Sequence, residues 1–500
     1  MHSASSEKTF YKLNKVFLYA IFLGLPLVIN NGYFNISATK SMYFLLLGIS
    51  YCLVSIVIYF ICIIKKTRPK IKLVATDVFL IAFAVANIVS ACLSKYSKGV
   101  WLGTESRLQG ALIILLYVLV CFMVSNGAKD IIKSGKLIQF FAMVFIFVIA
   151  LAVLHALDIS IFGLFNNLDI GQRHLFISTI GNMNFFSSFI CLALPLFVVS
   201  FMRAESKAEL KQWGIVLCVC GVAAVLSCSD GFVLGFIAFL AVAPFFFLND
   251  KKMFVRFWTA ISIILLSAAA FYYPYMLLPN QIYEPSSILG VILFPLVLAV
   301  IITVLVVICK KVNANPNFLK TFKYIYISGM VAAVLVVVTI FIIANQEYNP
   351  TAFSIFVFND NWGSLRGMIY RMCFEFLGEF SLKEWLVGIG PESLQYLFQN
   401  KGITYFDQAH CEYLQVLLSS GIFGLVAQLG SIIATVVIVI KKLRHNFLAL
   451  AFFFGLIAYW AQALISIAQP FTTPLMYLYL AIVVCEYKQL IINNDKENKK

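Results

Sequence analysis

The sequence is built from long apolar runs that follow one another along almost its whole length. A hydrocarbon core about 30 Å thick requires about 20 apolar residues in a helix. About 14 such runs are present, at 16–34, 42–64, 73–93, 110–126, 137–157, 184–202, 213–228, 231–248, 257–278, 287–309, 324–344, 412–440, 447–467 and 471–487. The runs are continuous rather than alternating, which favours helices over strands. The sequence therefore predicts an all-α polytopic membrane protein, in which the runs on either side of Ser229-Asp230-Gly231 are two spans or one long kinked one.

Composition supports this class and excludes the alternatives. Only 12% of the residues are charged and 62% are hydrophobic, so the chain lacks the charge that would cover the surface of a soluble or disordered protein. The 12 cysteines form no Cys-x-x-Cys or Cys/His cluster, and most are expected to be small core residues. The same pattern predicts no metal site. Cys373 and Cys411 both fall on the outside, where a disulfide between them is one alternative. The first run lacks a signal-peptide cleavage site, so it is expected to be a retained span.

The basic residues predict the orientation of the chain. Twenty-eight of the 37 Lys and Arg residues fall on alternate connections, and nine fall on the others. Since cytoplasmic loops carry the excess of basic residues, both termini are expected in the cytoplasm, in a multi-pass protein of the cell membrane. Most of the surplus of 15 positive charges therefore reflects the orientation of the chain in the membrane. The basic residues on the cytoplasmic side are spread over eight segments, which argues against nucleic-acid binding.

This orientation divides the chain into regions. Residues 1–344 are expected to form spans 1–11 with short outer loops. Residues 345–411 form a large extracytoplasmic segment, 412–487 form spans 12–14, and 488–500 form a cytoplasmic tail. A connection of this length is usually functional or disordered. Its tryptophans, tyrosines and phenylalanines predict that it folds against the membrane face.

The long segment carries the candidate chemistry. Residues 363–380 are expected to form a helix near the interface, with Arg366 and Tyr370 on one face and Arg371 pointing elsewhere. His410 stands at the mouth of the next span. It is either an interfacial residue bonded to a loop carbonyl or a general base, since imidazole titrates near neutral pH. The arginines are either structural pins or anion-binding forks.

Other outward features could join this site. Arg107 lies at the top of the fourth span, and Arg173 lies in the connection before the sixth. Asn182 and Asn184 are either helix caps or site residues. Asp230 is either a turn residue or an ionic partner.

In this order and placement, the residues resemble the O-antigen ligase and polymerase superfamily of bacterial membrane glycosyltransferases. The most specific part is 366–425. Arg366 with Tyr370 resembles the family's Arg-x-x-x-Trp/Tyr, and Gly388 with Gly390 resembles its Gly-x-Gly. His410 followed by Tyr413-Leu414-Gln415 and Gly421-x-x-Gly424 resembles its His-Asn-x-Tyr-Leu-Gln and Gly-x-x-Gly. Weaker matches are Arg107 with Gln109-Gly110, and Ser178-Thr179-x-Gly181-Asn182-x-Asn184.

The resemblance implies a GT-C-like helical fold with its large outer loop before the last three spans, and a ligase-related core at about 213–430. It implies transfer of a glycan from an undecaprenyl-diphosphate carrier to an acceptor hydroxyl or amine at the outer face of the membrane. The acceptor is unknown: a lipid-linked glycan, a lipopolysaccharide core, a wall polymer or a protein. His410 would be the base and Arg366 the diphosphate clamp, with no metal or cofactor. Arg371, Arg173 and Arg107 are further diphosphate-binding candidates.

Two departures from the family pattern stand out. Ser229-Asp230-Gly231 replaces the family's Ser-Arg-Gly, so that one phosphate-binding arginine is missing and Arg173 is a candidate substitute. Cys411 replaces the usual Asn after the histidine. The alternatives to a transferase are a membrane transporter or lipid-oligosaccharide flippase, and a non-catalytic scaffold. Transporters place ionisable groups near the midplane, whereas these spans are expected to be almost free of charge.

Overall fold

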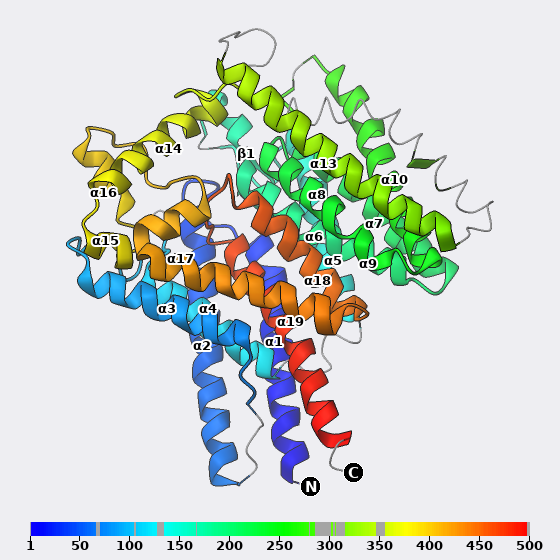
Figure 1. Cartoon of the computed structure of the whole chain (residues 1–500), viewed down its shortest axis with the longest axis horizontal. Coiled ribbons are helices and arrows are strands. Elements are labelled where there is room, and N and C mark those ends of the chain that lie inside the picture. Colours follow the sequence, from blue (N-terminus) through cyan, green and yellow to red (C-terminus); the bar gives the residue numbers. More distant parts are fainter. Residues whose placement is uncertain are drawn as a thin grey trace.

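The computed structural model describes residues 2–66, 71–104, 107–127, 135–166, 168–279, 281–285, 302–303, 306, 316–346 and 356–497. This part of the chain is mostly helical, with irregular connections between the helices and one short antiparallel pair of strands (Figure 1). The helices of the first half are α1 (His2–Leu27), α2 (Ile36–Ile64), α3 (Ala75–Leu93), α4 (Ala111–Gly127), α5 (Lys136–Ala156), α6 (Met183–Arg203), α7 (Lys207–Leu226), α8 (Asp230–Val242) and α9 (Pro244–Phe247). The later ones are α10 (Lys251–Met276), α13 (Pro316–Gln346), α14 (Trp362–Glu379), α15 (Leu382–Val387), α16 (Leu394–Asn400), α17 (Glu412–Ile438), α18 (Phe447–Gln462) and α19 (Thr472–Glu497). The strands are β1 (Phe176–Ile177) and β2 (Gly181–Asn182), preceded by the 3-10 turn η1 (Ile170–Leu175).

The described helices confirm an all-α polytopic membrane protein. Eleven are long and apolar enough to cross a membrane, and α4 and α18 are shorter apolar helices. Together they correspond to 13 of the predicted runs, and the run at 287–309 lies almost entirely outside the described residues. The first span lies at 9–27 rather than 16–34, because α1 ends just after Pro26 and the chain turns at Asn31 and Gly32, both with positive φ. The runs around Asp230 are two helices, separated where Cys228 adopts positive φ.

Helix α6 is the centre of the bundle. In its apolar window 94% of the residues are buried, as expected for a helix that is hydrophobic on all sides. It packs against α18, α7 and α10 (Figure 1). Phe189 and Phe197 of α6 meet Phe141 and Phe145 of α5 with ring centroids 5.2–5.9 Å apart, so aromatic contacts hold these two helices together.

The spans contain buried charges that the sequence pattern did not predict. Lys40 of α2 donates to the Leu25, Pro26 and Val28 carbonyls, at 2.6–3.3 Å, and so caps the end of α1. The Lys488 ammonium lies 2.9 Å from the Asp77 carboxylate, and both side chains are buried. Lys488, predicted in the tail, belongs to α19, which continues to Glu497. Lys40 is satisfied by backbone carbonyls, and Lys488 and Asp77 are satisfied by one another, so each has a structural role.

The segment before α17 folds on its own apolar cluster. Ile369, Phe376, Leu394, Phe398 and Leu418 are buried together between α14, α16 and α17, and Figure 1 shows α14, α15 and α16 grouped beside the start of α17. The predicted helix at 363–380 is present, but Gly363, Ser364 and Leu365 have non-helical φ and ψ, so the regular helix begins at Arg366. The segment is therefore an ordered platform in the described range 356–411.

Gly388 and Gly421 allow this platform to pack closely against α17. Gly421 has φ 66° and breaks α17, which frees the carbonyls of the preceding turn. The Ile389 and Gly390 amides donate to the Leu418 and Ser419 carbonyls, each at 3.0 Å. A Cβ on Gly388 would overlap the Ser419 carbonyl, and one on Gly421 would overlap the Leu386 carbonyl. The close approach therefore requires glycine on both sides.

Candidate functional site

His410 lies two residues before α17, in a backbone conformation with φ 51°. Burial lowers the pKa of its imidazole to about 4, and the positive charges of Arg366 and Arg107 lower it further, whereas Asp407 raises it. The His410 ring has no hydrogen-bond partner among the described residues, so both ring nitrogens are available to a substrate. A neutral imidazole of this kind can accept a proton at neutral pH.

Tyr370 connects α14 to His410. Its hydroxyl donates to the His410 main-chain carbonyl at 3.0 Å, which fixes the helix against the histidine. Arg366, one turn earlier on the same face, is thereby brought close enough for its charge to act on the His410 ring. The Arg-x-x-x-Tyr spacing thus places a guanidinium and an imidazole in one site.

The Arg366 guanidinium is mostly buried and only partly satisfied. Its Nη1 donates to the Gly363 carbonyl at 2.8 Å, within the irregular turn that starts α14. Its Nε is buried and finds no partner among the described residues. Burial lowers the pKa of Arg366, while Tyr370 and Asp230 raise it, and the group stays charged because a guanidinium remains protonated in proteins. A buried cation with an unused donor is suited to binding an anion.

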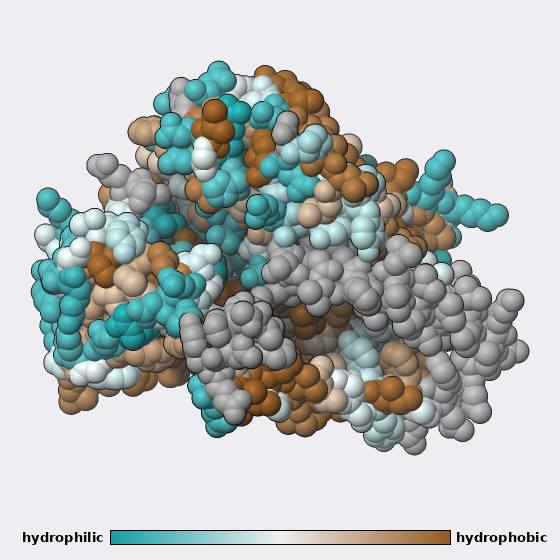
Figure 2. All heavy atoms as spheres, turned by 90° about the horizontal axis from the view of Figure 1, so that it is seen from above, coloured by the Kyte–Doolittle hydropathy of each residue, from teal (hydrophilic) through white to brown (hydrophobic). Residues whose placement is uncertain are grey.

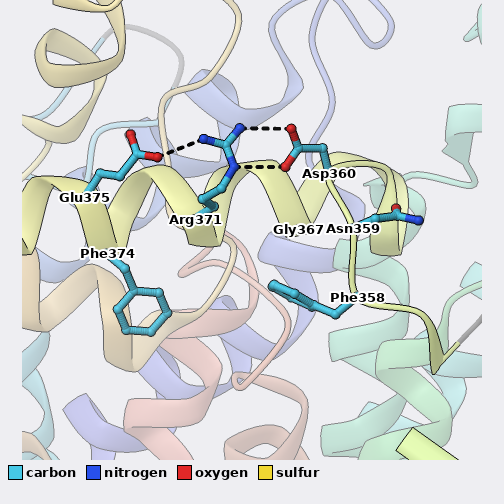
Figure 3. A pocket seen from close by; sticks show the side chains of 7 residues that line it. All are labelled: Phe358, Asn359, Asp360, Gly367, Arg371, Phe374 and Glu375. Atoms are coloured by element: carbon cyan, nitrogen blue, oxygen red, sulfur yellow. Dashed lines mark hydrogen bonds and ion pairs between the residues drawn. The ribbon is translucent and has the colours of Figure 1, made fainter. Parts of the chain in front are cut away.

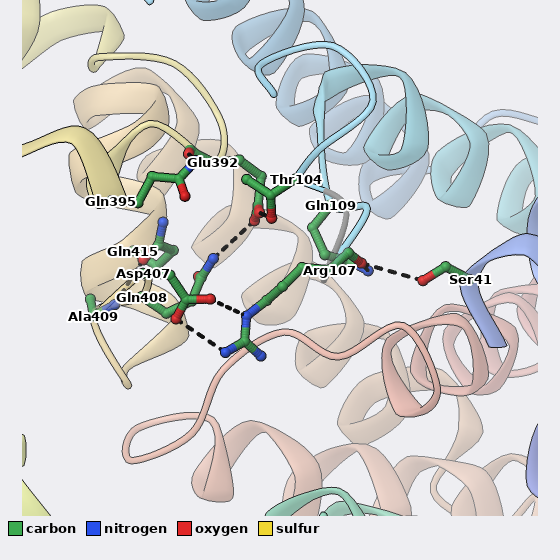
Figure 4. Close-up of polar contacts among 10 residues, drawn as sticks. All are labelled: Ser41, Thr104, Arg107, Gln109, Glu392, Gln395, Asp407, Gln408, Ala409 and Gln415. Atoms are coloured by element: carbon green, nitrogen blue, oxygen red, sulfur yellow. Dashed lines mark hydrogen bonds and ion pairs between the residues drawn. The ribbon is translucent and has the colours of Figure 1, made fainter. Parts of the chain in front are cut away.

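Arg107 enters the site as half of an ion pair (Figure 4). Its Nε and Nη2 donate to the two Asp407 oxygens at 2.6 and 3.1 Å, a bidentate arrangement. Buried Glu392 lies alongside and accepts from Thr104 and Gln408, at 3.1 and 2.9 Å. The Nε and Nη2 donors of Arg107 are therefore engaged by Asp407. The sequence reading missed Asp407 and Glu392, although Asp407 stands only three residues before His410.

The residues after His410 hold it in place. The Gln415 amide oxygen accepts from the Ala409 amide at 2.9 Å, and the Tyr413 hydroxyl donates to the Trp460 carbonyl at 2.8 Å. The Glu412 amide donates to the Ala463 carbonyl at 2.9 Å. Both polar members of the Tyr-Leu-Gln motif thus act as braces that fix the histidine segment against α18 and its own chain.

Asn182 and Asn184 have the structural roles that helix capping predicts. The Asn182 side chain accepts from the Asn184 amide at 2.9 Å and caps α6. The Asn184 oxygen accepts from the Ser229 hydroxyl at 3.0 Å, which ties α6 to the start of α8. Asp230, the first residue of α8, is exposed, and its charge acts on Arg366. Asp230 is therefore a helix-start residue rather than a turn residue, and an electrostatic effect on Arg366 connects it to the site.

The other two predicted arginines are engaged elsewhere. Arg173 on η1 donates to Asp158 at 3.0 Å and lies over the Phe165 ring. Arg371 is exposed and pairs with Asp360 and Glu375 at 2.9 and 2.8 Å. As predicted, Arg371 points away from the Arg366 face. Among the described groups, the charges that act on His410 are those of Arg366, Arg107 and Asp407.

A buried polar chain that sequence reasoning missed continues from the site into the bundle. Tyr459 donates to the buried Glu412 carboxylate at 2.8 Å and lies 3.1 Å from the Thr473 hydroxyl. Thr473 bonds with the Gln469 backbone, and the Gln469 side chain donates to Ser188 at 3.1 Å. The sequence offers no spacing that predicts this chain of contacts, because its members come from α6, α17, α18, α19 and the connection between α18 and α19.

Comparison with known proteins identifies the type of domain. Residues 282–429 match the family model described as O-antigen ligase, which confirms the resemblance predicted from the motifs. The matched range includes α14, the Gly388–Gly390 turn, His410 and the first two thirds of α17. No curated protein matches the chain.

Proposed function

We propose that the protein transfers a glycan from an undecaprenyl-diphosphate carrier to an acceptor hydroxyl or amine at the outer face of the cytoplasmic membrane. The observation that carries the proposal is that the His410 imidazole, whose ring has no hydrogen-bond partner among the described residues, lies within electrostatic range of the partly unsatisfied Arg366 guanidinium. The match of residues 282–429 to the O-antigen ligase model supports a ligase- or polymerase-type glycosyltransferase in general.

In this mechanism His410 accepts the proton of the acceptor as its oxygen or nitrogen attacks the anomeric carbon. The bond from that carbon to the diphosphate oxygen breaks, and the lipid diphosphate leaves. Arg366 stabilises the charge that develops on the leaving group, most strongly at a site with little water. A base opposite the leaving group corresponds to a single displacement, which inverts the anomeric centre.

The arginines are proposed to have different roles when the lipid diphosphate leaves. Arg366 contacts the diphosphate, because its donors are incompletely used. Arg107 contributes charge from within its Asp407 pair, and Asp230 moderates the Arg366 charge where the family pattern has an arginine. Arg371 is less suitable as a clamp, since carboxylates already occupy its donors. Arg173 also keeps a buried Nε with no partner among the described residues, but it is less suitable because it is not among the charges that act on His410.

The test is glycan transfer in membranes from cells that express single variants. His410→Ala is expected to abolish product while the protein still inserts, and the lipid-linked donor is expected to accumulate. His174→Ala, a change of an exposed histidine in another connection, serves as the matched control. Full transfer by His410→Ala would rule out the base assignment.

A second experiment separates transfer from transport. In proteoliposomes that contain a lipid-linked oligosaccharide, the proposal expects transfer without movement of the lipid between leaflets. Movement that persists in the His410→Ala and Arg366→Gln variants would instead favour the flippase alternative.

A further inference from the structure

The platform carries a group of charged residues on its surface and a carboxylate inside it. On the surface, where Figure 2 shows many hydrophilic side chains, Arg371 pairs with Asp360 and Glu375 beside an apolar hollow (Figure 3). Exposed ion pairs of this kind contribute little to stability. Glu392, in contrast, is only 6% exposed. A buried carboxylate is retained where hydrogen bonds or opposite charges satisfy it, so the role of Glu392 follows from its partners.

The Glu392 carboxylate joins two connections of the outer face (Figure 4). One oxygen accepts from the Thr104 hydroxyl at 3.1 Å, and the other accepts from the Gln408 side-chain amide at 2.9 Å. Thr104 stands three residues before Arg107, and Gln408, also buried, stands two residues before His410. One carboxylate therefore ties the segment that carries the guanidinium to the segment that carries the imidazole.

Glu392 itself stands on a well-anchored turn. Before it, the Ile389 and Gly390 amides donate to carbonyls of α17, each at 3.0 Å. After it, the Ser393 carbonyl accepts from the Tyr396 amide at 3.0 Å, where α16 starts. The turn is therefore fixed on both sides, and a side chain that projects from it can hold other segments in place.

Glu392 and His410 both have a backbone conformation that is uncommon for residues other than glycine. Their φ values are 58° and 51°, in the region where a Cβ is crowded. Such a conformation persists where the surrounding contacts enforce it. For His410, one such contact is the Tyr370 hydroxyl on its carbonyl. For Glu392, they are the two hydrogen bonds of its carboxylate, one of which leads through Gln408 to the histidine loop.

The charges that act on Glu392 belong to the same two segments. Burial raises the pKa of the Glu392 carboxyl, and the positive charge of Arg107 opposes this effect. The hydrogen bond from Gln408 also lowers the pKa, whereas the negative charge of Asp407 raises it. The carboxylate is thus close enough to the Arg107–Asp407 pair to interact with it, although its hydrogen bonds go to the neutral partners on either side.

We propose that Glu392 is a positioning residue, which holds the His410 loop at a fixed distance from the segment that carries Arg107. The inference rests on the proposed function, since His410 is a base only if the protein is the transferase described above. In this role Glu392 touches neither donor nor acceptor and acts through the loop. Because a displacement of about 1 Å near the reacting groups can slow a reaction by up to about 100-fold, loss of the bridge is expected to lower kcat more than it weakens donor binding.

A matched pair of amides separates the reach of the side chain from its charge. Glu392→Gln removes the charge and keeps the length that meets both partners, whereas Glu392→Asn removes the charge and the reach. Asparagine tolerates positive φ, so the turn itself is preserved. The control is Glu379→Asn, the same change at an exposed glutamate of the platform that pairs with Lys401.

The first readout is the pKa of His410, followed by NMR of histidine-labelled full-length protein in detergent. The chain has five histidines, and His410→Ala assigns the signal. Glu392→Asn is expected to raise this pKa by about one unit or more, because a loosened loop loses part of the burial that lowers it. Glu392→Gln and Glu379→Asn are expected to leave the pKa within about half a unit of the unmodified protein.

The second readout is the kinetics of glycan transfer. Glu392→Asn is expected to lower kcat about ten-fold while KM for the lipid-linked donor changes less than about two-fold. Glu392→Gln and Glu379→Asn are expected to keep most of the activity. If Glu392→Asn does not fold, Gln408→Met, which removes the amide donor and keeps the length of the side chain, is expected to change the pKa and kcat in the same directions.

Three results would overturn the positioning role: an unchanged His410 pKa in Glu392→Asn, equal changes in the two Glu392 variants, or the same change in Glu379→Asn. These results are distinguishable from failure of the proposed function. Full transfer by His410→Ala would defeat the base assignment, and the pKa shift in Glu392→Asn would still show that Glu392 holds the His410 loop. Loss of transfer in His410→Ala without any response of the pKa to Glu392 would defeat only the positioning role.

Discussion

The Tyr370 hydroxyl donates a hydrogen bond to the main-chain carbonyl of His410, across 3.0 Å and 40 residues of sequence. This bond connects the helix that carries Arg366 to the residue proposed as the base. In this chain the tyrosine therefore anchors the helix, and the arginine one turn away is close enough for its charge to act on the histidine.

Replacing Tyr370 by Phe removes only this hydroxyl. A hydrogen bond of this kind contributes about 1 kcal/mol, so kcat of glycan transfer is expected to fall roughly five-fold while the melting temperature changes little. Tyr396→Phe removes an equivalent bond, to the Lys98 carbonyl, and is the control. If both variants were equally active, Tyr370 would have no positioning role.

The acid limb of the pH profile is expected well below pH 6.5. Burial and the neighbouring arginines lower the pKa of His410 to about 4, so the base stays neutral and active as the pH falls below the ordinary histidine range. The free energy of unfolding is also expected to fall as the pH drops from about 6.5 to about 4 and to stay lower below pH 4, because the unfolded chain takes up a proton in this range that the folded chain does not. The measurement is kcat/KM against pH, with His174→Ala as control, and a midpoint at or above 6.5 would contradict this assignment.

The Arg107–Asp407 pair is expected to act as a unit. Asp407→Asn and Arg107→Gln each leave a partly buried partner without its bidentate contact, and each should lower transfer activity and the melting temperature. The double variant should lose less than the sum of the single losses, with a coupling energy above about 0.5 kcal/mol. Thermal unfolding of all four proteins measures this energy, and additive losses would show that the pair is independent.

Gly421→Ala is expected to prevent stable packing of the platform on α17. The added methyl group would overlap the Leu386 carbonyl, and the residue must also keep φ 66°. Gly402→Ala shares the positive φ, 80°, but its Cβ would meet open space, so it should cost only about 1 kcal/mol. Fluorescence-detected size exclusion compares the two, and equal yields would show that the close approach is not required.

Removing one charge of the Lys488–Asp77 pair is expected to destabilise the protein strongly, whereas removing both charges together is not. Asp77→Ala leaves the Lys488 ammonium buried without its carboxylate, which costs about 3–5 kcal/mol. The double change Asp77→Leu with Lys488→Met removes both charges and should recover much of the melting temperature. A double variant no more stable than Asp77→Ala would contradict this.

The sequence by itself determined the class of protein, because span length and the lack of charge follow from the bilayer and need no tertiary contact. The apolar runs corresponded to 13 described helices, and the motif order indicated the O-antigen ligase domain that the family model matches at 282–429. The spacing of Arg366 and Tyr370 was also informative, since residues four apart on a helix share a face.

The tertiary structure alone decided which charges meet. Arg107 and Asp407 are 300 residues apart, and no local pattern specifies that their side chains form a pair or that Arg371 is neutralised by Asp360 and Glu375. The buried Lys40, Asp77 and Lys488 were equally invisible, because a charge inside the bundle is tolerated only where distant backbone or carboxylate partners satisfy it. Local periodicity fixes the elements and their faces, whereas the ionisation and availability of each side chain depend on neighbours that the fold brings from elsewhere.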